Sequence, residues 1–282
     1  LFISSVIDSI EVLNIFSYII DSFSSSFNKF LIILKIGLLN CVENIRKIRR
    51  GKDFTRIYMA FEMEIFSNTY SDLEYAEVII VAGANISETF PTLTHWIWKA
   101  RDRGAKLIVI DPRMIPLART ADVHLDVKPG TDSALYGAML KYLVDHDMLD
   151  HDFIDNYTSG FDVTLDSVKD YTLEWAEEVT GIKKEKIKEA AELWGKAKTS
   201  FLLHARGIEH HSKGVDNVLG CINLVLATGR IGKPYCGYGT ITGQGNGQGG
   251  REHGHKCDQL PGNRDIENPE HRKYIADVWG ID

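Results

Sequence analysis

Residues 77–113 read EVIIVAGANISETFPTLTHWIWKARDRGAKLIVIDPR, and this stretch decides the fold. Residues 77–82 form a short apolar run, rich in β-branched side chains and ended by Gly83, which predicts a buried strand. Pro91 suits the first turn of a helix, and the apolar positions that follow it repeat at helical spacing. Residues 106–110 predict a second buried strand. A strand, a helix and a strand joined by short connections predict a right-handed βαβ unit.

Strand and helix patterns keep alternating along the rest of the chain. Short apolar runs at residues 123–125 and 201–203 predict two more strands. Helical patterns lie at residues 129–146, 152–157, 173–179, 184–198 and 215–229. Because strands that alternate with helices form parallel sheets covered on both sides, the sequence predicts an α/β fold with a mostly parallel sheet and helices on both faces.

The chain divides into three parts by composition. Residues 1–70 form an atypical apolar segment with helical character, residues 71–243 form the α/β domain, and residues 244–282 form a glycine-rich loop and the truncated start of a second α/β domain. The apolar runs of residues 1–70 are too short to span a membrane, and no signal peptide is recognisable there. This segment is interpreted either as a native helical hairpin packed on the rest or as foreign sequence.

Charge and cysteine content exclude several classes of protein. A net charge of −7 argues against a nucleic-acid-binding surface, which needs a basic excess or stripe. Four scattered cysteines without a CxxC pair favour a reducing compartment, so the cytoplasm is the expected location. The same spacing cannot supply the closely spaced thiolates of an iron–sulfur cluster. We assign no metal ligand and no catalytic side chain to this chain.

The loop after the first predicted strand is a candidate ligand site. In parallel sheets of this kind, ligands bind outside the carboxyl ends of the strands. The loop contains Gly83, Asn85 and Glu88, and it is small enough for its backbone to approach a phosphate at a helix N-terminus. It is not a GxGxxG motif, which disfavours an ordinary NAD-dependent dehydrogenase. A plain turn from strand to helix explains the same loop equally well.

Acidic side chains follow at the next two strand ends. Asp111 lies where a carboxylate can bind a ribose hydroxyl pair, or it can cap the turn before Pro112. Gly130, Thr131 and Asp132 begin a predicted helix, which Thr131 or Asp132 can cap. The Asp132 carboxylate can also accept the two adjacent N–H groups of a guanine. Three strand ends with nucleotide-suited residues favour a dinucleotide.

The ordered set of motifs resembles the molybdopterin oxidoreductases of the nitrate reductase and formate dehydrogenase group. The stretches that carry this resemblance are residues 81–89, 110–113, 121–122, 128–132, 205–214, 229–234 and 242–252. The resemblance implies a Rossmann-like sheet and a molybdenum or tungsten ion held by two molybdopterin guanine dinucleotides. It also implies a 4Fe-4S cluster and an electron-transfer protein or subunit as partner.

The resemblance assigns roles position by position. Gly83, Asn85 and Glu88 would contact one dinucleotide, and Asp111 would contact its ribose. The other implied positions are Gly130, Thr131 and Asp132 at the guanine, and Gly207, His210, Gln244 and Asn246 around the cofactor funnel.

Departures from the family pattern shape the functional prediction. Complete members carry a cysteine-rich cluster domain and a metal-binding cysteine or selenocysteine upstream of residue 77, and they continue beyond residue 282, so we expect an internal fragment. Thr242 stands where formate dehydrogenases of the group carry an arginine. This favours an assimilatory-type nitrate reductase with a small inorganic anion as substrate. A formate dehydrogenase alpha subunit with a one-carbon substrate, or a truncated product that is not catalytic, remain the alternatives.

Overall fold

The structure is a computed structural model that describes residues 67–241, 250, 253–254 and 257–281. The chain forms two compact units, one from Leu1 to Ile241 and one from Thr242 to Asp282. Residues 1–66 lie outside the described part, so the two interpretations of residues 1–70 stay predictions. Within the described residues, every helix is too short or too polar to cross a membrane.

The first unit contains a five-stranded sheet in the order β3-β2-β1-β4-β5. The strands are β1 Val78–Ala82, β2 Lys106–Ile110, β3 Val123–Leu125, β4 Ser200–His204 and β5 Gly237–Thr240. Each neighbouring pair is parallel, so all carboxyl ends lie along one edge. The chain builds outward from β1 to β3 on one side and then starts again on the other side with β4. The strand order therefore reverses between β1 and β4, as expected for a Rossmann-like sheet.

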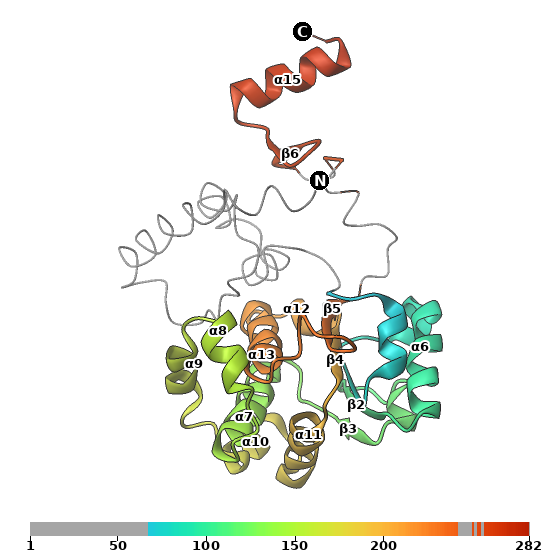
Figure 1. The fold of residues 1–282 in the computed structure, drawn as a ribbon, viewed down its shortest axis with the longest axis vertical. Coiled ribbons are helices and arrows are strands. Elements are labelled where there is room, and N and C mark those ends of the chain that lie inside the picture. The colour runs from blue at the N-terminus through green and yellow to red at the C-terminus, as the bar shows by residue number, and fades with distance from the viewer. Residues whose placement is uncertain (1–66, 242–249, 251–252, 255–256, 282) are drawn as a thin grey trace. The chain divides into compact units, whose positions relative to one another are not determined.

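Helices cover both faces of this sheet, as the sequence predicts (Figure 1). Alternate side chains of β1 point to opposite faces: Ile80 belongs to one apolar cluster, and Ile79 and Val81 belong to the other. The first cluster packs against α7 Asp132–Asp145, α11 Lys184–Lys196 and α13 Gly214–Ala227, with α8 His151–Tyr157, α9 Phe161–Val168 and α10 Leu173–Thr180 outside them. The second cluster packs against η2 Tyr70–Tyr75, α5 Ile86–Thr89, α6 Pro91–Asp102 and η3 Ala118–Thr120.

Strand β5, helix α9 and the short elements η2, α5, η3 and α12 Arg206–Glu209 of the first unit were not predicted. Strand β5 has the sequence GYGT, and glycines weaken the strand signal, so only its pairing with β4 makes it a strand. Helix α9 follows Gly160 and is also absent from the prediction. The helix predicted at residues 129–146 is real, but it begins at Asp132.

The second unit holds a small hairpin and a helix among its described residues. Strand β6 Gln259–Leu260 pairs antiparallel with β7 Arg264–Asp265. Helix α15 Pro269–Trp279 follows, and the Asn268 side chain caps it by accepting a hydrogen bond from the Glu270 amide at 2.9 Å. That this unit is the start of a second α/β domain stays a prediction.

Candidate functional site

Two glycines bring the loops after β1 and β4 into direct contact. The Gly207 amide donates a hydrogen bond to the Gly83 carbonyl at 3.0 Å. A Cβ atom on Gly207 would lie 2.5 Å from the Gly83 oxygen, and one on Gly83 would lie 2.7 Å from the Ile208 nitrogen. Only glycine fits at either position, because main-chain atoms occupy the space. This contact lies at the reversal of strand order, where ligands bind in open α/β sheets.

Asn85 offers an unused acceptor in the loop after β1. Its Oδ1 atom is buried and makes no hydrogen bond within the described part of the chain. Buried polar atoms are nearly always paired, so this atom fits a ligand that brings a donor. Glu88 is exposed, and the helix after the loop, α5, has only four residues. A single turn contributes little helix dipole, so any phosphate here would depend on the backbone and side chains of the loop, and the phosphate site stays a prediction.

Asp111 is buried at the end of β2, with 3% of its surface exposed. Its Oδ1 atom accepts a hydrogen bond from the Arg113 amide at 2.8 Å, which confirms that it caps the turn around Pro112. His124 Nε2 contacts the Asp111 carbonyl oxygen at 2.8 Å and fixes the backbone there. A carboxylate can accept several hydrogen bonds, so the cap and the predicted ribose contact are compatible.

Asp132 is also buried, with 4% of its surface exposed. Burial raises the pKa of this carboxyl group; hydrogen bonds from its own amide and from Gly130 and the charge of His211 oppose the rise, and the charge of Asp111 adds to it. Asp132 therefore lies within electrostatic range of Asp111 after β2 and of His211 after β4. Gly130 turns the backbone with φ +85°, and open space surrounds the place of its missing Cβ.

The predicted capping of α7 by Thr131 or Asp132 is wrong. The N-cap residue Thr131 makes no capping hydrogen bond, because its hydroxyl donates to the Lys128 carbonyl at 2.7 Å instead. The first turn of α7 is held from α13: Asn217 Oδ1 accepts from the Ser133 amide at 3.0 Å. Asn217 Nδ2 also donates to the Ile208 carbonyl at 2.9 Å. Asn217 thereby ties the Asp132 loop to the Gly207 loop.

A buried charged cluster lies under the loop after β4 and was missed by sequence reasoning. Glu209, 1% exposed, ends α12 Arg206–Glu209, and its Oε2 atom pairs with the Arg206 guanidinium. Its Oε1 atom lies 3.4 Å from His204 Nδ1, an ion-pair distance without good hydrogen-bond geometry. The other ring nitrogen of His204 contacts the Tyr238 hydroxyl.

The ionisation of Glu209 follows from these contacts. Burial raises the pKa of Glu209, but His204 and Arg206 outweigh it, so the pKa lies below its ordinary value and the carboxyl group is ionised near neutral pH. The i,i+3 spacing of Arg206 and Glu209 was a visible signal for an ion pair. Nothing in the local sequence indicated that the carboxylate would be buried.

The predicted funnel residues are only partly within the described part of the chain. Gly207 and His210 are exposed at the carboxyl edge, next to the cluster. Gln244 and Asn246 lie outside the described residues. Among the residues with described positions, no three His, Cys, Asp or Glu side chains gather in a way that could hold a metal ion.

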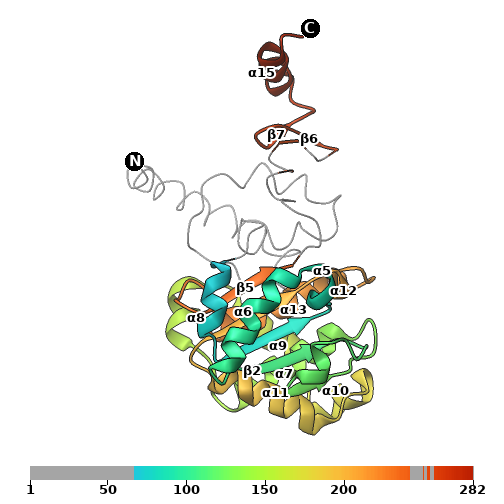
Figure 2. The ribbon, with the colours of Figure 1, turned by 90° about the vertical axis from the view of Figure 1, so that its right-hand side faces the viewer.

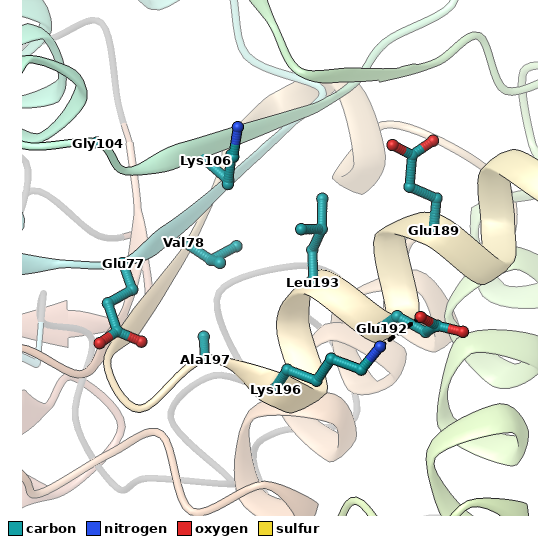
Figure 3. A pocket seen from close by; sticks show the side chains of 9 residues that line it. All are labelled: Glu77, Val78, Gly104, Lys106, Glu189, Glu192, Leu193, Lys196 and Ala197. Carbon is teal, nitrogen blue, oxygen red and sulfur yellow. Dashed lines mark hydrogen bonds and ion pairs between the residues drawn. The ribbon is translucent and has the colours of Figure 1, made fainter.

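A pocket of about 380 Å³ lies at the opposite, amino edge of the sheet (Figure 3). It is lined by the starts of β1 and β2 and by one side of α11, and it carries Glu77, Lys106, Glu189, Glu192 and Lys196. Charges of both signs mix there, and Lys196 pairs with Glu192. This pocket is separate from the residues at the carboxyl edge.

Comparison with known proteins agrees with this arrangement. Residues 24–277 match the family model for molybdopterin oxidoreductase. The chain is 47% identical over 215 residues to the assimilatory nitrate reductase catalytic subunit of Bacillus subtilis, a match that covers 76% of this chain and 30% of that protein. It is 35% identical over 240 residues to the F420-dependent formate dehydrogenase 1 subunit alpha of Methanococcus maripaludis, covering 85% of this chain and 35% of that protein.

A solved structure shows the same fold. Acetylene hydratase from Pelobacter acetylenicus superposes with a TM-score of 0.54 and 23% identity, over 59% of this chain and 25% of that one. The chain spans about a third of the length of the curated relatives that it matches. The family match extends over most of the chain and agrees with the motifs at the strand ends. The chain therefore belongs to the molybdopterin oxidoreductase family.

Proposed function

We propose that this chain is the dinucleotide-binding part of a molybdopterin enzyme whose nearest functional type is an assimilatory nitrate reductase. The observation that carries the proposal is the contact of the Gly83 and Gly207 loops where the strand order reverses, with Asp111 and Asp132 after the next strands along the same carboxyl edge. The substrate class rests on the 47% identity to a nitrate reductase subunit and on Thr242 in place of an arginine. Nitrate is therefore the proposed substrate.

The proposed cofactor is a molybdenum or tungsten ion held by two molybdopterin guanine dinucleotides. The described residues fit such a group, because the buried Oδ1 atom of Asn85 can accept a hydrogen bond from it. Gly83, Asn85 and Glu88 would contact one dinucleotide, and Asp111 would accept hydrogen bonds from its ribose. When bound, the metal supplies two-electron redox chemistry, and the protein supplies position and electrostatics.

The guanine end of the dinucleotide would lie at Gly130, Thr131 and Asp132. Two adjacent N–H donors of the base match the two oxygens of the Asp132 carboxylate. Hydrogen bonds to the ionised form also oppose the effect of burial, which otherwise disfavours the charge. Gly207 and His210 would line the cofactor funnel; the same role for Gln244 and Asn246, which lie outside the described residues, stays a prediction. For the full-length protein the proposal includes a 4Fe-4S cluster whose ligands this chain does not supply, an electron-transfer protein or subunit as partner, and a cytoplasmic location.

A formate dehydrogenase alpha subunit is the second candidate. Several relatives of that kind align over about 85% of the chain, at 30–35% identity. A product that is not catalytic is the third. Dye-linked assays of the intact native protein separate them: we expect nitrate reduction without formate oxidation. Formate oxidation would favour the second candidate, and neither activity in a metal-loaded protein would favour the third.

Metal and nucleotide analysis tests the cofactor directly. The intact native protein that contains this chain is purified, its metals are measured by mass spectrometry, and guanine nucleotides are released by acid. We expect molybdenum or tungsten, with guanine nucleotide in twofold excess over the metal. Asp132→Asn should lower the guanine nucleotide content, while Asp147→Asn, at an exposed position just after α7, should not. A native protein without either metal and without guanine nucleotide would contradict the proposal.

A further inference from the structure

The segment from Arg206 to Lys213 turns its basic side chains to the surface and its acidic side chain to the core. Its ionisable side chains are Arg206, Glu209, His210, His211 and Lys213. The single acid, Glu209, is turned into the core, whereas the basic groups are partly or fully exposed. The surface that this segment offers to a ligand is therefore made of groups that can carry positive charge or donate hydrogen bonds.

The buried carboxylate of Glu209 holds the Arg206 guanidinium in place. Its Nη1 atom pairs with Oε2 of the buried carboxylate, whose other oxygen faces His204. The Arg206 side chain is nevertheless 41% exposed, so a ligand can reach it. An arginine held in this way loses little side-chain entropy when it binds, and its planar fork matches two oxygens of an anion.

Arg206 lies next to the glycine contact at the centre of the carboxyl edge. Gly207 follows it directly in α12 and packs on Gly83, so α12 and the loop before α5 are side by side (Figure 2). Asp111 and Asp132, the groups proposed for ribose and guanine, lie at neighbouring loops of the same edge. The part of a dinucleotide between its sugar and its pterin is a pyrophosphate, which needs positive charge.

We propose that Arg206 binds an oxyanion at the reversal of strand order, with its guanidinium fixed by the buried Glu209. The anion is either the pyrophosphate of the dinucleotide or the small anionic substrate, and both present paired oxygens to the fork. This inference rests on the proposed function, in which the carboxyl edge of the sheet binds the cofactor. It adds a role for Arg206, to which the resemblance assigned none.

Anion titrations of the full 282-residue chain test the inference. Isothermal titration calorimetry with inorganic pyrophosphate, nitrate and formate, each separately, gives the dissociation constants. Arg206→Gln should weaken the binding of the responsible anion by about ten- to a hundredfold, as expected for a charge-assisted hydrogen bond pair. Arg206→Lys should weaken it less, because the charge remains and the fork is lost.

Arg103→Gln is the matched control. Arg103 is also an exposed arginine paired with a glutamate, Glu74, at 2.7 Å, but it follows α6 at the amino edge of the sheet. The substitution changes the net charge equally and should leave anion binding unchanged. Far-UV circular dichroism checks that each variant folds; if Arg206→Gln does not fold, Arg206→Lys decides.

The three anions distinguish the two sources. Binding of pyrophosphate that depends on Arg206 assigns the residue to the cofactor, whereas nitrate or formate binding that depends on it assigns the residue to the substrate. A chain that binds none of the three anions, or variants of Arg206 that bind them as the wild type does, would overturn the inference. Metal and guanine nucleotide found in the native protein would still support cofactor binding, so a failure of the Arg206 inference can be told from a failure of the proposed function.

Discussion

Gly83→Ala places a methyl group where the loops after β1 and β4 touch. The new Cβ atom would lie 2.7 Å from the Ile208 nitrogen and 2.8 Å from the Gly207 carbonyl carbon. Both are main-chain atoms, so no flexible side chain can move aside. Overpacking of this kind costs about 1–3 kcal/mol. The left-handed backbone at Gly83, φ +55°, adds about 1–2 kcal/mol for a residue with a side chain. We expect Gly83→Ala to lower the free energy of unfolding by about 2–5 kcal/mol.

Two further glycine variants separate the two causes. Gly207→Ala creates the steric clash alone, because its Cβ atom would lie 2.5 Å from the Gly83 oxygen and its backbone is not left-handed. It should lower the free energy of unfolding by about 1–3 kcal/mol. Gly104→Ala has a left-handed backbone, φ +98°, and no atom within 4 Å, so it should cost about 1–2 kcal/mol. Urea unfolding of the full chain, followed by circular dichroism, measures all three.

The double variant checks that the loops share one contact. Gly83→Ala and Gly207→Ala push on the same pair of loops, so together they should cost less than the sum of their separate effects. Additive effects would mean that the two glycines act independently. If Gly83→Ala costs no more than Gly104→Ala, the close approach of the loops does not limit stability, and the explanation of the glycine pair is wrong.

Three further substitutions probe the site. Asn217→Ala removes the two hydrogen bonds that tie α7 to α12 and should destabilise the chain by about 2–3 kcal/mol in urea unfolding, whereas the exposed Asn156→Ala should change it by less than about 0.5 kcal/mol. The pKa of Glu209 is lower in the folded chain than its value of 4.5 in the unfolded chain, so this group stabilises the fold above pH 4.5, and the stabilisation is lost as the pH falls through the folded pKa. Glu209→Gln should therefore make the free energy of unfolding depend less on pH on the acid side. An unchanged pH dependence there would contradict this. The pKa of Asp132 is higher in the folded chain than its value of 3.8 in the unfolded chain, so this group destabilises the fold as the pH rises above 3.8. Asp132→Asn should therefore melt at a higher temperature than the wild type at pH 7. A lower melting temperature would show that the Asp132 charge stabilises the chain without a ligand.

Local sequence was sufficient for most of the sheet. Strands β1, β2 and β4 each contain a run of consecutive apolar residues, and burial on both faces requires that pattern. Strand β5 was missed because its glycines carry little preference for an extended backbone, and its hydrogen bonds come from β4. Whether a segment of weak preference becomes a strand depends on its neighbour.

The candidate site was predicted in part. Gly83, Asp111 and Asp132 were found because every carboxyl end of a parallel sheet lies on the same edge, so strand prediction alone locates them. Glu209 was missed because a buried carboxylate needs partners from other segments, here His204 on β4. Its environment could not be derived from the residues beside it in the chain.

The sequence by itself determined the parallel α/β fold and the family, and it predicted the edge proposed to carry the site, because strand runs, turn residues and ordered motifs are local features. Only the tertiary structure decided that β1 lies between β2 and β4, and hence that Gly83 meets Gly207. It also decided that Asp111 and Asp132 share one electrostatic environment and that Glu209 is buried beneath Arg206. The physical reason is that backbone preferences act over a few residues, whereas the pairing of distant strands and the burial of charge depend on contacts between segments far apart in the chain.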